Sequence, residues 1–236
     1  MTEELFREDG YLRSCEATVT AVDGGGIVLD RTVFYATGGG QPGDTGVLRT
    51  ADGREVRIVD CVKDRESGAH LHVPADGEPA LSPGDAVTAE IDWERRHRLM
   101  RMHTCLHLLC SLVPGAVTGG SVGDGKGRLD FDAPEGLDKE RLSADLNRLI
   151  AEDRAVRFSW IGDDELAAKP DLVRTMSVQP PSGQGRVRII EVEGTDLQPC
   201  GGTHVRSTGE IGRVRVGKIE KKGRLNRRVN VVLDET

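Results

Sequence analysis

The sequence predicts an α+β protein: a small β-barrel-like domain over residues 1–90, followed by an α+β domain over residues 91–236 with a mostly antiparallel sheet. Three observations support this prediction. The first domain contains short apolar segments separated by Gly and Pro, as in small barrels and sandwiches. A long helical pattern then occupies residues 92–113. Beyond it, helical patterns are followed by runs of strands, which is typical of α+β domains.

In the first domain, strands are expected at residues 15–22, 27–30, 54–62 and 86–91. The first two flank a glycine-rich turn and should form a hairpin. Residues 38–46 are also rich in glycine, but they lack the Lys of a P-loop and the spacing of a dinucleotide-binding site. Three interpretations of this stretch remain open: a structural turn, a phosphate cradle, or a loop packed onto the second domain.

In the second domain, Asp92 is a suitable N-cap for the helix over residues 92–113, and Pro114 follows its end. Apolar residues recur at helical spacing within it, which predicts packing in a core. Residues 119–127 are glycine-rich and are expected to be flexible. The further elements are helices over 137–153 and 163–168 and strands over 128–132, 155–160, 187–192, 211–219 and 229–233.

Composition narrows the possible function classes. The 236 residues carry a net charge of −7, which argues against a generally basic surface for nucleic acid. No apolar stretch is long enough for a membrane span, and no signal peptide is expected. Five cysteines are scattered without a disulfide framework, which indicates a reducing, cytoplasmic location.

His103 and His107 lie four residues apart in the predicted helix, so both imidazoles share one helix face. This is the spacing with which two histidines of a helix bind one metal ion. Zinc proteases use the same spacing, but Thr104 stands where those enzymes carry their general-base Glu. A zinc protease is therefore not predicted.

Cys200 and His204 are also four residues apart, and the two glycines between them favour a tight turn over a helix. Three imidazoles and a thiolate select Zn²⁺ over Mg²⁺ or Ca²⁺. Four protein ligands fill a tetrahedral site, so a catalytic ion must either expand its coordination or leave one residue unbound. Asp196 is placed to orient a ligand imidazole. The other Cys and His residues show no ligand spacing and are expected to be structural: Cys15, Cys61, Cys105, Cys110, His70, His72 and His97.

Two local clusters of basic residues stand out against the acidic chain. Such runs usually form a solvated surface, and the alternative is contact with nucleic-acid phosphates. The first cluster comprises Lys218, Lys221, Lys222, Arg224, Arg227 and Arg228. The second comprises Arg95, Arg96, Arg98 and Arg101.

Four blocks of sequence resemble the editing domain shared by alanyl- and threonyl-tRNA synthetases. They are most similar to the free-standing alanyl-tRNA editing proteins, the AlaX family. The blocks are residues 38–44, 103–109, 119–121 with 128–132, and 200–205, in the same order as in that family.

The resemblance implies a Zn²⁺-dependent aminoacyl-tRNA hydrolase that acts in trans on mischarged tRNA(Ala), chiefly on Ser-tRNA(Ala) and also on Gly-tRNA(Ala). The expected metal ligands are His103, His107, Cys200 and His204, and the polar candidates for the substrate pocket are Thr104, Ser121 and Gln41. The first basic cluster would then contact tRNA. We recognise no ATP site and no segment of a class II synthetase core.

Two other functions remain open. One is an RNA-binding module in which the zinc is purely structural. The other is a zinc hydrolase that acts on a small acylated metabolite.

Overall fold

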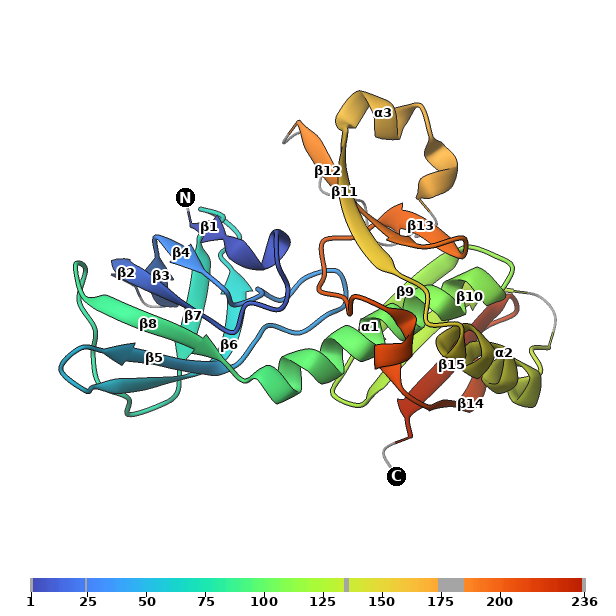
Figure 1. Ribbon diagram of the computed structural model, residues 1–236, viewed down its shortest axis with the longest axis horizontal. Coiled ribbons are helices and arrows are strands. Elements are labelled where there is room, and N and C mark those ends of the chain that lie inside the picture. The colour runs from blue at the N-terminus through green and yellow to red at the C-terminus, as the bar shows by residue number, and fades with distance from the viewer. Residues whose placement is uncertain (1, 24, 134–135, 174–184, 235–236) are drawn as a thin grey trace. The chain divides into compact units, whose positions relative to one another are not determined.

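The computed structural model describes residues 2–23, 25–133, 136–173 and 185–234. The chain folds into two compact units, Met1–His97 and Arg98–Thr236 (Figure 1). Helix α1 (Trp93–Leu112) begins in the first unit and continues into the second. The boundary between residues 90 and 91 that the sequence suggests stays a prediction about domain organisation.

The first unit is a closed, six-stranded barrel with the strand order β2-β3-β7-β6-β5-β8, and all neighbouring strands are antiparallel. Closure leaves no unpaired edge among these strands. The predicted β-barrel-like fold is confirmed. A short parallel pair, β1 with β4, and the 3-10 turn η1 accompany the barrel. The bounds are β1 Glu3–Glu4, η1 Leu5–Arg7, β2 Ser14–Asp23, β3 Gly26–Leu29, β4 Arg31–Thr32, β5 Gly46–Thr50, β6 Glu55–Lys63, β7 His70–Pro74 and β8 Ala86–Ile91.

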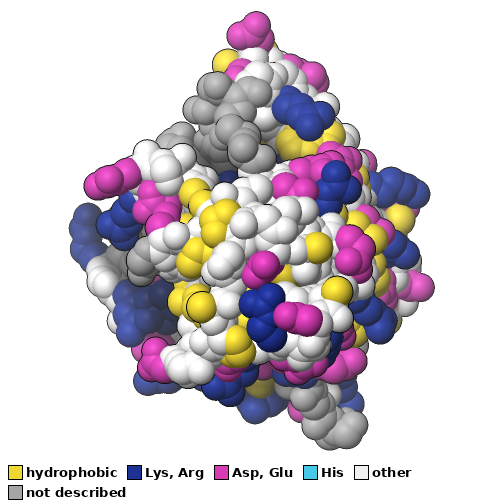
Figure 2. Space-filling view, turned by 90° about the vertical axis from the view of Figure 1, so that its left-hand side faces the viewer, with side chains coloured by type: hydrophobic (Ala, Val, Ile, Leu, Met, Phe, Trp, Pro, Cys, Tyr) yellow, Lys and Arg dark blue, Asp and Glu magenta, His cyan; other side chains and the backbone are white. Residues whose placement is uncertain are grey.

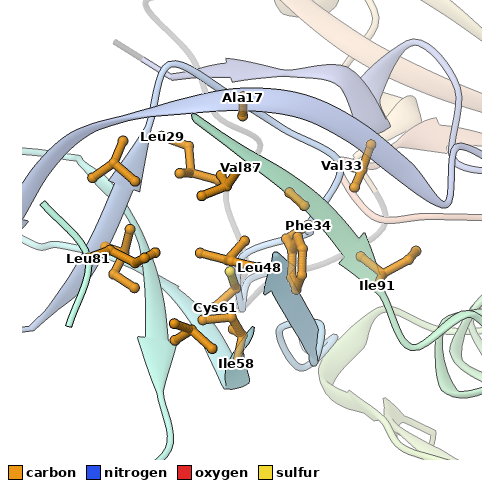
Figure 3. Close-up of a cluster of buried hydrophobic side chains, with 14 residues drawn as sticks. Ala17, Leu29, Val33, Phe34, Leu48, Ile58, Cys61, Leu81, Val87 and Ile91 are labelled. Atoms are coloured by element: carbon orange, nitrogen blue, oxygen red, sulfur yellow. The ribbon is translucent and has the colours of Figure 1, made fainter. Parts of the chain in front are cut away.

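Aliphatic side chains fill the barrel, as the low aromatic content requires. Along β6, buried and exposed residues alternate, and the side chains of Val56, Ile58 and Cys61 are buried. A register irregularity between Ile58 and Asp60 shifts the alternation by one residue, which brings Cys61 inward. Figure 3 shows its sulfur within the cluster that also contains Leu48.

The glycine-rich stretch forms a tight turn. Gly38 and Gln41 exchange backbone hydrogen bonds of 3.0 and 2.9 Å. Between them, Gly39 and Gly40 have φ angles of +56° and +82°, which is the type I′ pattern that favours glycine at both central positions. The predicted turn is confirmed, whereas contact of this stretch with a phosphate or with the second domain stays a prediction.

A buried ion pair anchors the chain that follows this turn. The Arg96 guanidinium is fully buried and donates from Nε to the Asp44 carboxylate over 2.9 Å. It also donates to the carbonyls of Val33 and Gly10, over 2.7 and 3.0 Å. The same carboxylate accepts the Tyr35 backbone N–H over 2.6 Å. Arg96 therefore ties the start of α1 to the barrel, although the sequence suggested a surface cluster for it.

The second unit contains two antiparallel sheets, with the orders β14-β15-β10-β9 and β11-β12-β13. This agrees with the predicted α+β class and its antiparallel sheets. The bounds are β9 Val117–Val122, β10 Lys126–Asp132, α2 Lys139–Ala151, β11 Val156–Gly162, α3 Asp163–Ala167, η2 Pro170–Leu172, β12 Arg186–Val192, β13 Asp196–Pro199, η3 Thr208–Ile211, β14 Val214–Lys221 and β15 Asn226–Leu233.

Helix α1 packs against strand β10 at a glycine. A Cβ on Gly127 would lie 2.7 Å from Met102 Sδ and 3.2 Å from Leu106 Cδ1, so any larger residue would have to displace these side chains of the helix. The stretch over residues 119–127 was expected to be flexible, and this expectation is wrong. Most of it belongs to β9 and β10, and Gly127 within it makes room for the helix.

Helix α2 packs on β14 through the apolar face that its sequence predicts (Figure 1). Leu142, Leu146, Leu149 and Ile150 are buried, and the Asp138 side chain caps the helix by accepting the Arg141 N–H. None of the helices in the described ranges has an apolar stretch that would reach across a bilayer.

We expect Asp44→Asn to lower the free energy of unfolding by about 3–5 kcal/mol, because it leaves the buried Arg96 charge without its counter-ion. Urea denaturation measures this loss. The matched control is Glu55→Gln, which removes an exposed partner of Arg49 and should cost less than about 1 kcal/mol. Equal losses in the two variants would contradict a stabilising role of the buried pair.

Candidate metal centre

Helix α1 supplies two imidazoles from one face. His103 and His107 are one helical turn apart, both are buried, and their ring centroids are separated by 5.4 Å. The neighbouring Leu106 and Met102 hold the helix on β10, so the two rings project from a rigid element. Cys105, between the histidines, is fully buried, and burial raises the pKa of its thiol to about 12.

The loop after β13 supplies the thiol and the third imidazole. Its backbone is held by Arg188, whose guanidinium donates to the carbonyls of Cys200 and Gly202 over 3.2 and 2.8 Å. The Gly202 N–H points at Cys200 Sγ over 3.4 Å. These contacts bend the chain into the turn that the two glycines predict, and they bring Cys200 and His204 to the same side.

The two halves converge. Cys200 Sγ lies 3.5 Å from His103 Nε2 and 3.3 Å from His204 Nε2. The donor atoms of these three residues and His107 all lie within 4.8 Å of one another. Residues nearly a hundred positions apart in sequence thus form one group of three nitrogens and one sulfur.

Hydrogen bonds behind the donors set the protonation of two imidazoles. His107 Nδ1 lies 2.8 Å from Asp196 Oδ2, and that oxygen also accepts from Gln198 Nε2 over 2.7 Å. His204 Nδ1 lies 3.1 Å from the Thr104 hydroxyl, which itself donates to a helix carbonyl. In both rings the Nδ1 proton is held by an oxygen, so the Nε2 lone pair is free to bind a metal.

The charges of the group favour a cation. Burial alone would raise the pKa of the Cys200 thiol, but the His103 and His204 imidazoles outweigh burial and hold that pKa well below its usual range. Burial would lower the pKa of His107, but Asp196 and Cys200 outweigh burial and raise it to about 10. The Cys200 thiolate and the Asp196 carboxylate bring negative charge to the group, which a protonated His107 balances in part and which a divalent ion would neutralise in its place.

The donor set fits a metal of zinc type. A tetrahedral Zn²⁺ with bonds of about 2.0–2.3 Å places its ligand atoms roughly 3.3–3.7 Å apart, close to the two separations measured for Cys200 Sγ. The outer hydrogen bonds to His107 and His204 are those that ligand histidines commonly have. The four residues could therefore hold such an ion.

The predicted pocket residues lie in different places. Thr104 is fully buried, and its hydroxyl contacts His204 Nδ1, a helix carbonyl and the Val205 N–H. Ser121 is half-buried on β9. Gln41 is buried in the first unit, beside the glycine turn. The contact of each with a substrate stays a prediction.

Some of the basic residues are exposed to solvent, and others form hydrogen bonds or ion pairs within the protein. Arg227 is buried and donates to the carbonyls of the β14–β15 turn, while Arg228 pairs with Asp130 over 2.8 Å. In the cluster on α1, Arg98 pairs with Asp124 and Arg101 donates to the Ile211 carbonyl. The exposed members are Lys218, Lys221, Lys222 and Arg224.

Sequence reasoning missed two residues of this site. Gln198 precedes Cys200 by two positions on β13, so its side chain and that of Asp196 share one face of the strand. Arg188 lies on β12, where its neighbours are aliphatic. A charged residue inside an apolar strand pattern is the signal that could have identified Arg188.

The comparisons with known proteins first define a class. A family model described as "tRNA synthetases class II (A)" matches residues 10–95, and one described as "Threonyl and Alanyl tRNA synthetase second additional domain" matches residues 187–230. The second match contains both Cys200 and His204. The first was not expected, since no class II segment was recognised in the sequence.

Full-length relatives then identify the family. An alanyl-tRNA editing protein AlaX-M of Methanosarcina acetivorans is 38% identical over 99% of both chains. Another, of Saccharolobus solfataricus, is 34% identical over 97% of this chain and 98% of the relative. The chain belongs to this AlaX family of alanyl-tRNA editing proteins. It also matches an alanine–tRNA ligase of Sulfurisphaera tokodaii with 36% identity, but spans only 25% of that enzyme.

We expect Asp196→Asn to weaken metal binding by roughly 10–100-fold, because the weaker acceptor no longer fixes the tautomer and orientation of His107. Competition with a chromophoric zinc chelator measures the affinity. The matched control is Glu193→Gln, an exposed acid near the same hairpin. If both variants bind zinc as tightly as the wild type, the Asp196 carboxylate does not orient a ligand.

Proposed function

We propose that this protein is a trans-acting aminoacyl-tRNA deacylase that hydrolyses the ester of mischarged tRNA(Ala), chiefly Ser-tRNA(Ala), with Gly-tRNA(Ala) as a second substrate. The observation that carries the proposal is the convergence of His103, His107, Cys200 and His204 in a chain that aligns end to end with alanyl-tRNA editing proteins. The five cysteines all lie in the described ranges and are free thiols, which is compatible with a cytoplasmic location.

The metal in this proposal is Zn²⁺, held by the four converging residues. Such an ion polarises an ester carbonyl or lowers the pKa of a water molecule. The chain's own contribution is positional: Asp196 holds His107, Thr104 holds His204, and Arg188 holds the turn that carries Cys200. Hydrolysis of an activated ester requires less catalysis than hydrolysis of a peptide bond, so a positioned metal ion suffices without a further catalytic side chain.

Serine differs from alanine by one hydroxyl group, and selectivity between Ser-tRNA(Ala) and Ala-tRNA(Ala) depends on this group. A pocket that hydrogen-bonds the serine hydroxyl leaves its own polar groups unpaired when alanine enters, and such sites discriminate by on the order of 10⁴. Thr104, Ser121 and Gln41 are the proposed polar residues. Of these, Ser121 has a partly exposed side chain in the unit that contains the metal donors.

The proposed tRNA surface is the β14–β15 hairpin. Lys218, Lys221, Lys222 and Arg224 are exposed there, and Lys222 also pairs with Glu220. Arg227 and Arg228 are engaged within the protein. On the face of the molecule in Figure 2, basic side chains are interspersed with acidic ones. A local basic hairpin therefore suits this acidic chain better than a general basic coat.

We expect the protein to release serine from Ser-tRNA(Ala) up to on the order of 10⁴-fold faster than alanine from Ala-tRNA(Ala). Deacylation of tRNA charged with radiolabelled amino acid measures both rates. Equal rates, or no serine release by the zinc-loaded protein, would overturn the proposal. If the protein instead hydrolyses small acylated metabolites and tRNA does not inhibit this hydrolysis, the metabolite hydrolase would be favoured.

Cys200→Ala distinguishes this enzyme from an RNA-binding module with a structural zinc, a rival suggested by the four protein ligands. If the protein is a deacylase, Cys200→Ala should remain folded but lose deacylase activity. Circular dichroism measures whether the variant is folded. A structural zinc would be supported by two results together. The second unit of Cys200→Ala would unfold, and the wild type would bind tRNA without deacylating it.

We expect the double variant Lys221→Glu with Arg224→Glu to raise KM for tRNA and leave kcat unchanged, because it removes proposed phosphate contacts and alters none of the metal donors. Each lost contact reduces the slope of log affinity against log salt by about 0.9 or less. Arg141→Glu, an exposed residue on α2, is the control and should change neither quantity. Identical salt slopes in both variants would exclude the hairpin from the tRNA surface.

A further inference from the structure

A second group of metal-type donors lies in the barrel, apart from the site described above. Cys61 on β6 and His70 and His72 on β7 place a thiol and two imidazoles within 4.8 Å of one another. No sequence pattern groups these three residues, and each was expected to be structural. All three belong to the first unit.

Strand register explains the grouping. Cys61 pairs directly with His72 in the antiparallel β6–β7 ladder, so the two side chains lie on the same face. His70 is two residues from His72 and therefore shares that face. The two imidazole rings stack with centroids 5.1 Å apart and an interplanar angle of 26°. The Cys61 sulfur lies in the barrel interior (Figure 3).

The group contains a polar atom whose burial is otherwise unexplained. His70 is only 2% exposed, and its Nε2 has no hydrogen-bond partner among the residues that the structure describes. Buried polar atoms are normally paired, so an orphaned imidazole nitrogen beside a thiol and a second imidazole calls for a ligand. A metal ion would satisfy this nitrogen.

The hydrogen bonds behind both imidazoles suit coordination through Nε2. His70 Nδ1 faces Glu4 Oε1 over 3.4 Å, and His72 Nδ1 faces the Ile27 carbonyl over 2.9 Å. A carboxylate and a carbonyl keep the ring proton on Nδ1, which is how ligand histidines are commonly held. The metal-donor group of the second unit uses the same arrangement.

The short β1–β4 pair provides part of this outer layer. Glu4 and Thr32 are register partners. Glu4 Oε1 lies 3.4 Å from His70 Nδ1, and the Thr32 hydroxyl lies 2.7 Å from His72 Nε2. The Thr32 hydroxyl accepts the Phe34 N–H and donates to His72 Nε2 over 2.7 Å. Coordination at His72 would replace this one hydrogen bond.

We propose that Cys61, His70 and His72 form a second binding site for a soft divalent cation of the Zn²⁺ class within the barrel. Binding breaks the S–H bond of Cys61 and releases its proton to solvent, while both imidazoles bind as neutral ligands. Zinc ligands lie roughly 3.3–3.7 Å apart, so side-chain shifts of about 1 Å close the group around the ion. Because the group is buried, the metal enters as the barrel folds.

The test uses the full chain and Co²⁺ as the probe. The protein is unfolded with chelator, refolded with Co²⁺, and analysed for bound metal and for thiolate-to-cobalt absorption. We expect about two equivalents per wild-type chain, one at each donor group. Cys61→Ser should lose about one equivalent and roughly half of the thiolate absorption. The control, Cys15→Ser, alters a half-buried thiol of the same barrel and should retain both.

A second variant guards against failure of Cys61→Ser to fold. His70→Gln keeps a polar side chain at a position outside the apolar cluster and should also lose one equivalent. One equivalent in the wild type that neither variant changes would overturn the proposal, and a metal-free, hydrogen-bonded core would then account for the group. A second equivalent that survives both variants would overturn it as well. Neither result bears on deacylation.

Discussion

The packing of α1 on β10 is the contact on which the metal-donor group depends. Gly127 lets Met102 and Leu106 approach the sheet more closely than any side chain would permit. The helix is thereby fixed, and His103 and His107 project from it in a defined direction. The opposite half of the group is fixed independently by Arg188, which binds two carbonyls of the Cys200 turn. Each half is held by contacts that do not involve a metal, so little ordering entropy would oppose the binding of an ion.

The two donor groups found among the described residues lie on different elements, but their histidines are held in a similar way. In the second unit the imidazoles come from a helix and a turn, and in the barrel they come from one strand. In both, an oxygen atom holds Nδ1–H: Asp196 for His107, and Ile27 for His72. This outer contact determines which nitrogen is free, and therefore whether a buried histidine can bind a metal at all.

The glycine-rich turn and Arg96 have structural roles, although each resembled a phosphate-binding feature in the sequence. Gly39 and Gly40 adopt positive φ angles that other residues rarely accept, and Asp44, beyond the turn, pairs with Arg96. A buried charge pair contributes little net stability relative to apolar packing, but losing one partner is costly. Its effect is to define one position for the start of α1 relative to the barrel strands of the same unit.

Local patterns in the sequence predicted much of the architecture. The apolar spacing of α1 and α2, the alternation along most barrel strands and the two four-residue spacings of Cys and His are all visible within a few turns of chain. Asp196 was expected beside one of the four candidate donors because it lies just before Cys200, and it does contact His107. Strands β7 and β9 were missed, since polar histidines in one and glycines in the other hide the strand pattern.

The sequence by itself thus determined the two half-sites, the helices that carry or flank them and the family resemblance. Only the tertiary structure decided that the halves meet, that Thr104 and Gln198 stand behind the donors, and that Cys61 faces His72 across a ladder. The physical reason is that helical spacing is set by neighbouring residues, whereas register and convergence depend on which distant segments pack together. No single stretch of chain contains that information.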